Sequence, residues 1–334
     1  MTRIDVGGPW FEDLKVGQVF DDAPPITITP GHTAMHQALF GDRMRLPLDA
    51  PLARAVTGRA EMLVHPNLVC NIAIGQTTVA TQRVRGNLFY RGLILQRPVM
   101  VGDTLHTTTE VVGLKQNRRR AGKPATGLVA LRMTTLNQHG NAVVDCWRCP
   151  MIPLRDPEVD TGHADRFDDE IPADLDARSL ARAVPPWRLE VFRERAPGSA
   201  MDLDVGTTYV VEAQEPVSGA PELVRMTMNV AMVHLDASAS SDGRRLVYGG
   251  HTISIAGAQL TRAFPNLVTL LAWRSCDHLA PVFEGDLLRS EATIHRVTPL
   301  DGGGGMVDLH VITSAVRADG DERVLDWRPV GLMP

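Results

Sequence analysis

The sequence predicts an α+β protein built from two tandem units, each with a long central helix wrapped by an antiparallel sheet. Three short strings recur in the same order in the two halves of the 334-residue chain, at an offset of about 180–190 residues. Ordered matches of this kind indicate a duplicated unit and not a solenoid, whose copies would be shorter and more numerous. The matching stretches are LKVGQVF (14–20) with LDVGTTY (203–209), RPVMVGDTL (97–105) with APVFEGDLL (280–288), and VVDCWRCPMIP (143–153) with VLDWRPVGLMP (324–334).

The length of the chain fits two units of ordinary domain size. We expect an N-terminal unit over 1–155 and a C-terminal unit over 191–334. The stretch between them, 156–190, is charged, contains prolines and lacks sustained apolar alternation. We therefore expect it to be a linker with one short helix.

Helices are predicted from small and apolar residues and from capping signals. Short strands near 18–28 and 207–215 open the two units. In the first unit TPGHTAMHQALFG follows, with Thr29 as the expected N-cap and Pro30 at the first helical position. Small, apolar segments then predict one buried helix in each unit. These segments are HPNLVCNIAIGQ (65–76) and HTISIAGAQLTRAF (251–264).

Runs rich in β-branched residues follow each central helix, and their alternation predicts strands. The polar stretches NQHGN (137–141) and ADGDE (318–322) are expected to be hairpin turns. A helix that covers one face of an antiparallel sheet is an α+β arrangement. The expected strands are 87–99, 103–114, 127–137 and 142–152 in the first unit, and 267–276, 286–297, 306–317 and 323–331 in the second.

Composition excludes several classes of function. Hydrophobic residues make up 44% of the chain, charged residues 22%, and the formal net charge is −5, which is typical of a folded globular protein. No basic stripe with interleaved aromatics points to nucleic acid, and no apolar run reaches the ~18 residues that span a membrane. The polar N-terminus does not resemble a signal peptide, and four cysteines suggest a reducing cytoplasm. We interpret Cys146 and Cys149 as strand residues and not as a metal or redox site.

The order of a strand, a small-residue helix and strands with P-V-x-x-G-D-x-L resembles the hot dog fold. In tandem it resembles the MaoC-like dehydratase and hydratase family of the double hot dog type. NLFYRGLILQRPVMVGDTL and RLVYGGHTISIA are the most specific stretches, and the resemblance covers about 10–155 and 200–334. They are most similar to the two-repeat proteins that include the mesaconyl-CoA hydratases (β-methylmalyl-CoA dehydratases). The resemblance implies a hydro-lyase that reversibly hydrates a 2-enoyl-CoA and needs no cofactor.

The family's site pattern, Gly-Asp-x-Asn-Pro-x-His, is divided between the two units. In the first unit GDRMRLP keeps Asp42 but has Pro47 at the histidine position. In the second unit MNVAMVH keeps His234 but has Asn229 at the aspartate position and Ala231 in place of Asn. The resemblance therefore implies a catalytic C-terminal unit and a degenerate N-terminal unit that binds the substrate tail.

Hydration of a 2-enoyl thioester needs a base for water, an acid for the α-carbon and donors for the thioester oxygen. His234 is the expected proton-transfer residue, because an imidazole titrates near neutrality. Asn229 is not a base but can orient the water or the imidazole. If a carboxylate takes part, Asp236 is the first candidate and Asp42 the second.

The start of the second central helix is the expected source of oxyanion donors. Its first N–H groups are unpaired, and Gly249 and Gly250 allow close approach of substrate. His251 opens the same helix and is expected to line the site or cap the helix. A dicarboxylic acyl group or the CoA phosphates would also need an arginine. Arg91 is the candidate we retain, and Arg83 and Arg85 flank the same strand.

Other interpretations stay open at this point. His234 can be a structural histidine bonded in a loop, Asp236 can cap the following turn, and the two glycines can serve the turn alone. A non-catalytic protein that binds acyl-CoA thioesters is the alternative to the hydratase. A thioesterase on the same fold is a weaker one, because 251–264 contains no Asp or Glu. The resemblance favours a short branched acyl group such as mesaconyl, and a homodimer is compatible with the fold.

Overall fold

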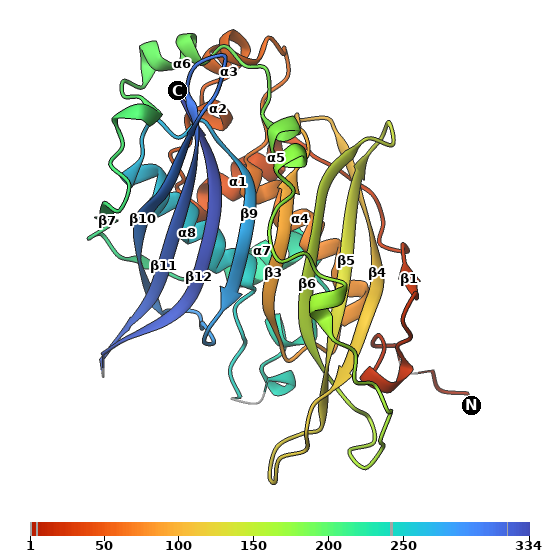
Figure 1. Ribbon diagram of the computed structural model, residues 1–334. Coiled ribbons are helices and arrows are strands. Elements are labelled where there is room, and N and C mark those ends of the chain that lie inside the picture. Colours follow the sequence, from red (N-terminus) through yellow and green to blue (C-terminus); the bar gives the residue numbers. More distant parts are fainter. Residues whose placement is uncertain (1, 5, 241–242, 319) are drawn as a thin grey trace.

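The computed structural model describes residues 2–4, 6–240, 243–318 and 320–334, and its strands form one continuous antiparallel sheet (Figure 1). The strands of the first half are β1 (Val19–Phe20), β2 (Ile26–Thr27), β3 (Gly86–Leu95), β4 (Thr104–Gln116), β5 (Thr126–Asn137) and β6 (Ala142–Pro153). Those of the second half are β7 (Thr208–Val210), β8 (Glu215–Pro216), β9 (Thr269–His278), β10 (Leu287–Pro299), β11 (Gly305–Arg317) and β12 (Gly320–Met333).

The order of the strands repeats across the middle of the sheet. It runs β1-β4-β5-β6-β3-β9-β12-β11-β10-β7, and β2 and β8 pair with β4 and β10. The second half is therefore the first half in mirror order, joined through β3 and β9. At that junction Tyr90 is paired with Cys276 and Leu93 with Trp273. The α+β prediction and its eight long strands are confirmed.

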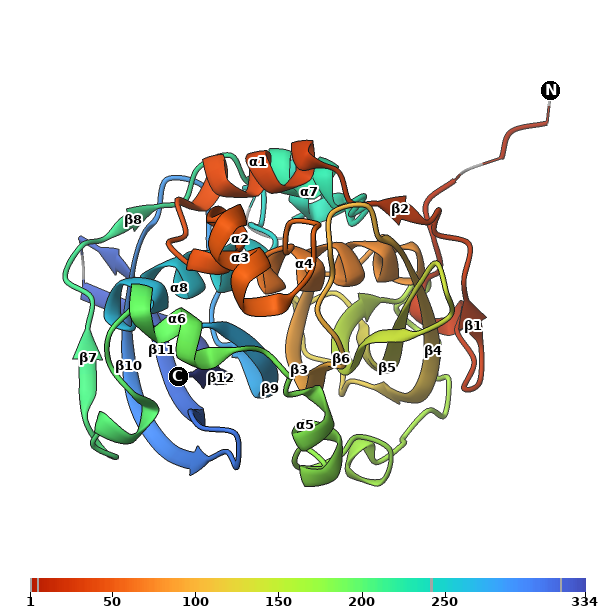
Figure 2. The same cartoon turned by 90° about the horizontal axis from the view of Figure 1, so that it is seen from above.

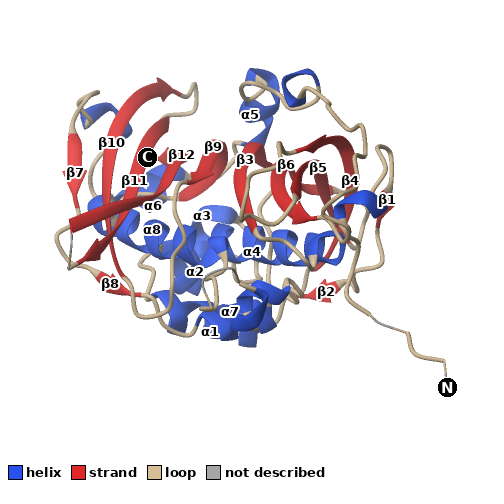
Figure 3. Cartoon of the chain, turned by 90° about the horizontal axis from the view of Figure 1, so that it is seen from below, coloured by secondary structure: helices blue, strands red, loops and turns tan. Residues whose placement is uncertain are grey.

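Two central helices, α4 (Pro66–Gln76) and α8 (Gly249–Ala263), cover the same side of the sheet (Figures 2 and 3). The remaining α-helices are α1 (Pro30–Phe40), α2 (Arg45–Leu48), α3 (Ala50–Thr57), α5 (Ala177–Ala183), α6 (Leu189–Arg195) and α7 (Ala220–Met226). Short 3-10 turns are η1 (Phe11–Asp13), η2 (Thr77–Thr81), η3 (Phe167–Asp169), η4 (Ala200–Asp202), η5 (Met232–His234) and η6 (Ala237–Ala239).

The helix predictions follow from capping and burial. Thr29 is the N-cap of α1 and Pro30 its first residue, as expected. Every residue of α4 is buried, which explains why its sequence is small and apolar around the whole helix. The second central helix begins at Gly249, two residues earlier than the apolar pattern indicated.

The opening strands are a correction. Instead of continuous strands over 18–28 and 207–215, each unit has two short pieces, β1 with β2 and β7 with β8. In the first unit Pro24 and Pro25 interrupt the ladder, since proline has no N–H to donate. In the linker expected at 156–190, the structure has η3 and α5, and α6 crosses the expected boundary at 190. The NQHGN turn joins β5 to β6, while Asp319 of the ADGDE turn lies outside the described residues.

The duplicated string P-V-x-x-G-D forms the same turn twice. Asp103 accepts a hydrogen bond from the backbone N–H of Met100 at 2.8 Å, and Asp286 accepts one from Phe283 at 3.0 Å. The glycine before each aspartate has a positive φ, 102° at Gly102 and 91° in the second copy. Only glycine adopts such a backbone without strain. The turn therefore requires the same glycine in both units, which explains why this string is recognisable in both halves of the sequence.

One apolar core extends through both units. It includes residues of α4, α8, β3 and β9, and Trp273 and Trp327 meet in it edge to face at 5.7 Å. The two central helices pack against each other within this core. Among the described residues, no helix combines the length and apolar character needed to cross a membrane.

Candidate active site

A cavity of about 330 Å³ lies between the two units. The first unit contributes η2 and the inner faces of β3 and β6, and the second contributes the 229–234 loop, the start of α8 and the end of β9. The volume is at the lower end of the range for small-molecule sites. The lining residues that bear on chemistry are Thr81, Arg85, Tyr90, Arg148, Asn229, His234, Tyr248, Gly249 and His278.

His234 is held in one tautomer at the end of η5. Its Nδ1 lies 2.7 Å from the carbonyl oxygen of Leu246. Because a carbonyl only accepts, Nδ1 carries the hydrogen and Nε2 keeps a free lone pair. Burial lowers the pKa of His234 to about 4, against the opposing effect of the Leu246 hydrogen bond, and the charge of Arg148 lowers it further. The imidazole is therefore neutral at pH 7 and able to accept a proton.

Asn229 lies at the start of the same loop and is 4% exposed. Its Oδ1 accepts a hydrogen bond from the backbone N–H of Ala231 at 2.9 Å, while its buried Nδ2 has no partner among the described residues. The next residue, Val230, donates its N–H to Thr78 Oγ1 at 2.9 Å. The side chain of Asn229 is thus fixed on one side, and its amide donors remain available to a ligand.

The same docking arrangement occurs in the first unit, where Arg43 donates its N–H to Thr261 Oγ1 at 3.2 Å. In both cases the loop with the Asp or Asn packs at the C-terminal end of the other unit's central helix. Each candidate site is therefore composite, because its loop is positioned by a helix from the opposite half of the chain.

The two glycines at the start of α8 have different surroundings. A Cβ at Gly249 would lie 2.5 Å from Nε2 of His278, so glycine leaves room for that imidazole at the cavity. A Cβ at Gly250 would lie 2.0 Å from Oδ1 of Asn71 on α4. We conclude that Gly249 borders the cavity, whereas Gly250 permits close packing of the two helices. In the first turn of α8 the N–H of His251 donates to the Tyr248 carbonyl at 2.8 Å, while the N–H groups of Gly249 and Gly250 precede it at the helix start.

Two residues of the cavity were missed by the sequence reasoning. Arg148 on β6 is 3% exposed and donates from Nη2 to Thr81 Oγ1 at 2.6 Å. His278 ends β9, and its buried Nε2 has no partner among the described residues. Burial, and then the neighbouring His234, lower the pKa of His278 to about 4.

A signal for Arg148 does exist in the sequence. It occupies an inward position of an alternating strand, where the neighbouring inward residues are apolar, and a charge at such a position is unusual. His278 has no comparable signal, because it meets the cavity only where the end of β9 reaches Tyr90 of β3, with 5.9 Å between the ring centroids.

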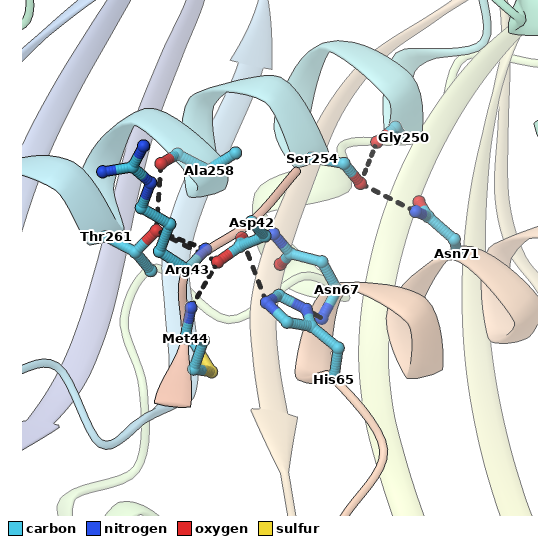
Figure 4. A network of polar contacts seen from close by, with 10 residues as sticks. All are labelled: Asp42, Arg43, Met44, His65, Asn67, Asn71, Gly250, Ser254, Ala258 and Thr261. Atoms are coloured by element: carbon cyan, nitrogen blue, oxygen red, sulfur yellow. Dashed lines mark hydrogen bonds and ion pairs between the residues drawn. The ribbon is translucent and has the colours of Figure 1, made fainter. Parts of the chain in front are cut away.

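Asp42 is not among the residues that line this cavity. It belongs to a separate network of polar contacts (Figure 4). Its carboxylate is 1% exposed, pairs with Nε2 of His65 at 3.1 Å and accepts a hydrogen bond from Thr261 at 3.0 Å. Burial alone would raise the pKa of Asp42, but His65 and the hydrogen bond from Met44 outweigh burial and lower it. These protein partners occupy the carboxylate, which therefore has no contact with the cavity that holds His234.

Three further expected site residues also lie outside the cavity. Asp236 is exposed and accepts hydrogen bonds from the N–H and hydroxyl of Ser238, so it caps η6. His251 is fully buried, with Nε2 2.9 Å from the Ser218 carbonyl. Arg91 forms an ion pair with Asp277 at 2.7 Å. Each of these side chains has a partner within the protein that accounts for its position.

Comparisons with known proteins agree with the architecture. The family model described as mesaconyl-CoA hydratase matches residues 2–264. A mesaconyl-CoA hydratase from Cereibacter sphaeroides is 31% identical over 320 residues, covering 91% of this chain and 89% of that protein. A β-methylmalyl-CoA dehydratase from Chloroflexus aurantiacus is 29% identical, covering 93% and 88%.

Among solved structures, a conserved hypothetical protein from Mycobacterium tuberculosis, described as having a double hotdog fold, is 47% identical. It superposes with a TM-score of 0.90 and covers 99% of this chain and 100% of that one. The prediction of two tandem hot dog units is therefore confirmed, and so is the resemblance on which it was based.

Proposed function

Because the chain belongs to the mesaconyl-CoA hydratase family, we propose that it reversibly hydrates a short, branched 2-enoyl-CoA such as mesaconyl-CoA. The observation that supports this most is His234. Its Nδ1 is fixed on a carbonyl and its neutral ring borders a cavity between the units. A histidine in this state is suited to take a proton from water.

In the proposed reaction, His234 accepts a proton from water through Nε2 while the water oxygen bonds to the β-carbon. The electrons of the double bond move toward the α-carbon and the thioester oxygen. The protonated Nε2 then returns the proton to the α-carbon, so one imidazole serves as base and acid. No second proton carrier is required, which suits a cavity whose described lining contains no Asp or Glu.

Two other groups support this reaction. The free Nδ2 of Asn229 orients the attacking water by a hydrogen bond. The N–H groups at the start of α8, next to Gly249, stabilise the charge that develops on the thioester oxygen, assisted by the positive end of the helix dipole. Asn229 thereby replaces the family's aspartate as an orienting residue and leaves the proton transfer to His234.

The experiment follows the enoyl-thioester absorbance of crotonyl-CoA, mesaconyl-CoA and a longer 2-enoyl-CoA with purified protein. We expect the band of mesaconyl-CoA to disappear fastest, without release of free thiol. Free CoA thiol would identify a thioesterase and contradict the hydratase.

A second candidate function rests on the same lining. Since neither Asp236 nor Asp42 reaches the cavity, a protein that binds acyl-CoA thioesters without turnover is the alternative. It predicts flat absorbance traces together with a thermal shift from the same ligands. A cytoplasmic location and a homodimer remain part of the proposal. The four cysteines, all buried as free thiols, fit the first, and sedimentation velocity tests the second.

A further inference from the structure

The cavity contains a buried cation that the proton-transfer mechanism does not use. Arg148 is 3% exposed, and Nη2 donates to Thr81 Oγ1 at 2.6 Å and to the Thr77 carbonyl at 3.4 Å. Its Nε has no partner at all among the described residues. Among the described residues, no carboxylate lies within ion-pair distance of this guanidinium, whereas the partly buried Arg91 and Arg274 each pair with an aspartate.

A buried guanidinium without a counter-ion is costly, because its desolvation is not offset by an opposite charge. The surroundings do not compensate. Burial lowers the pKa of Arg148. The groups that oppose this effect are neutral, namely Tyr90, which also hydrogen-bonds to the guanidinium, Tyr248 and Cys146. The described lining also contains Arg85 but no acidic residue. The cavity is therefore electropositive, and the missing counter-ion has to come from a ligand.

We propose that Arg148 binds the free carboxylate of a dicarboxylic acyl group and thereby selects dicarboxylic over monocarboxylic enoyl-CoA esters. This inference rests on the proposed hydratase function and specifies its substrate class. An arginine presents paired N–H donors in the planar geometry of a carboxylate. Nε, which has no partner among the described residues, is a free donor for one oxygen of such a carboxylate.

The position of Arg148 distinguishes an acyl carboxylate from the phosphates of CoA. Phosphates are bulky, strongly hydrated groups that a site holds near solvent. Arg148 lies instead on the inner face of β6, paired in the sheet with Tyr90 of β3 and Leu131 of β5. Arg148 and His234 line the same cavity. The acyl end of the ligand is the part that reaches this depth.

The test compares two thioesters that differ in one group. Mesaconyl-CoA with the thioester next to its methyl-bearing carbon has a carboxylate where tiglyl-CoA has a methyl group. We expect Arg148→Gln to lower kcat/KM for mesaconyl-CoA about 100-fold and to change that for tiglyl-CoA less than about fivefold. Arg132→Gln, on the neighbouring strand and ion-paired with Asp145 at the surface, is the matched control and should leave both values unchanged. Equal losses for both thioesters in Arg148→Gln would overturn the assignment.

A second variant keeps the test valid if the first one misfolds. A binding measurement tests the role of Arg148 even if the protein does not hydrate the substrate. If Arg148→Gln lowers the melting temperature strongly, Arg148→Lys is used instead, because it retains the charge. The quantity compared is again kcat/KM for mesaconyl-CoA relative to that for tiglyl-CoA. Calorimetry with the unreactive pair methylsuccinyl-CoA and 2-methylbutyryl-CoA measures recognition without turnover. We expect the wild-type protein to bind methylsuccinyl-CoA at least about tenfold more tightly. That preference without any hydration contradicts the proposed function but supports the role of Arg148. Equal affinities overturn the role of Arg148, whether or not hydration occurs.

Discussion

At the scale of single residues, the proposed chemistry depends on keeping one imidazole neutral. Burial and the nearby Arg148 hold the pKa of His234 far below its ordinary value of 6.5, and the Leu246 carbonyl fixes which nitrogen is free. His234, Asn229 and Gly249 were predicted because each belongs to a local motif. Asp236 and Asp42 were chosen for proximity in sequence or for the motif. In the structure the carboxylate of Asp236 binds Ser238 and that of Asp42 binds His65, and neither residue lines the cavity.

The pH dependence of activity follows from the pKa of His234. In the proposed mechanism the neutral imidazole accepts the proton, and the pKa of His234 in the folded protein is about 4. We expect kcat/KM for mesaconyl-CoA to stay level from pH 8 to about 5. Near pH 4 it should begin to fall, by about tenfold per pH unit. Rates measured over pH 3.5–8, after brief exposure to each pH, check this. An acidic limb centred near 6.5 would contradict it.

Stability is expected to change over the same interval. His234, His251 and His278 all have pKa values lowered to about 4, chiefly by burial. Since the unfolded chain binds protons at these positions below about pH 6.5, acidification stabilises the unfolded state relative to the folded one. The free energy of unfolding should therefore be greatest above pH 6.5 and decline as the pH falls toward 4. Urea unfolding at pH 7.5, 6 and 5 measures this decline. Constant stability over that range would mean that these imidazoles are already solvated.

At the scale of elements, the start of α8 combines a proposed catalytic role and a structural role in adjacent glycines. The helix itself was predictable, because its buried residues are small and apolar over several turns. Its first two residues were expected to act together at the site. The structure separates them, since Gly249 faces His278 of β9 and Gly250 faces Asn71 of α4. The different surroundings of the two glycines arise from contacts between elements that are remote in sequence, and no local sequence pattern predicts such contacts.

The two glycines form a matched pair of substitutions. Gly249→Ala places a methyl group against the His278 imidazole, which has to move into the cavity. We expect at least about tenfold loss of kcat/KM with a small change in melting temperature. Gly250→Ala forces α8 away from α4 and should cost about 1–3 kcal/mol of unfolding free energy. Assays and thermal unfolding of both variants provide the comparison. A purely structural effect at both positions would contradict the assignment of Gly249.

At the scale of the whole molecule, the duplication produced one site from two halves. The repeat was visible in the sequence because glycine and aspartate in the P-V-x-x-G-D turn have strict conformational roles. The sequence does not reveal that the site loop of each unit binds the central-helix end of the other unit. Val230 bonds to Thr78, and Arg43 to Thr261, only after the two units pack together. Arg148 and His278 come together across the β3–β9 junction for the same reason.

A composite cavity predicts that neither half works alone. Separated fragments 1–190 and 191–334 would each expose the β3 or β9 edge and part of the shared core, and we expect them to aggregate or remain partly unfolded. Circular dichroism, size-exclusion chromatography and the absorbance assay test each fragment. Co-expression of both should restore activity. A fragment 191–334 that hydrates mesaconyl-CoA by itself would contradict the composite site.

The central claim is that His234 carries the proton during hydration of an enoyl-CoA. The measurement that tests it most directly is the rate of loss of the mesaconyl-CoA absorbance band with wild-type protein and with His234→Asn, at equal concentrations and with melting temperatures recorded. Asparagine places an amide N–H where Nδ1 of the imidazole lies, so it retains a donor for the Leu246 carbonyl but cannot carry a proton. We predict rapid loss of the band with the wild type. The variant should be slower by about 10²–10⁴-fold with a nearly unchanged melting temperature. Equal rates for the two proteins would show that His234 is a structural residue and that another group carries the proton.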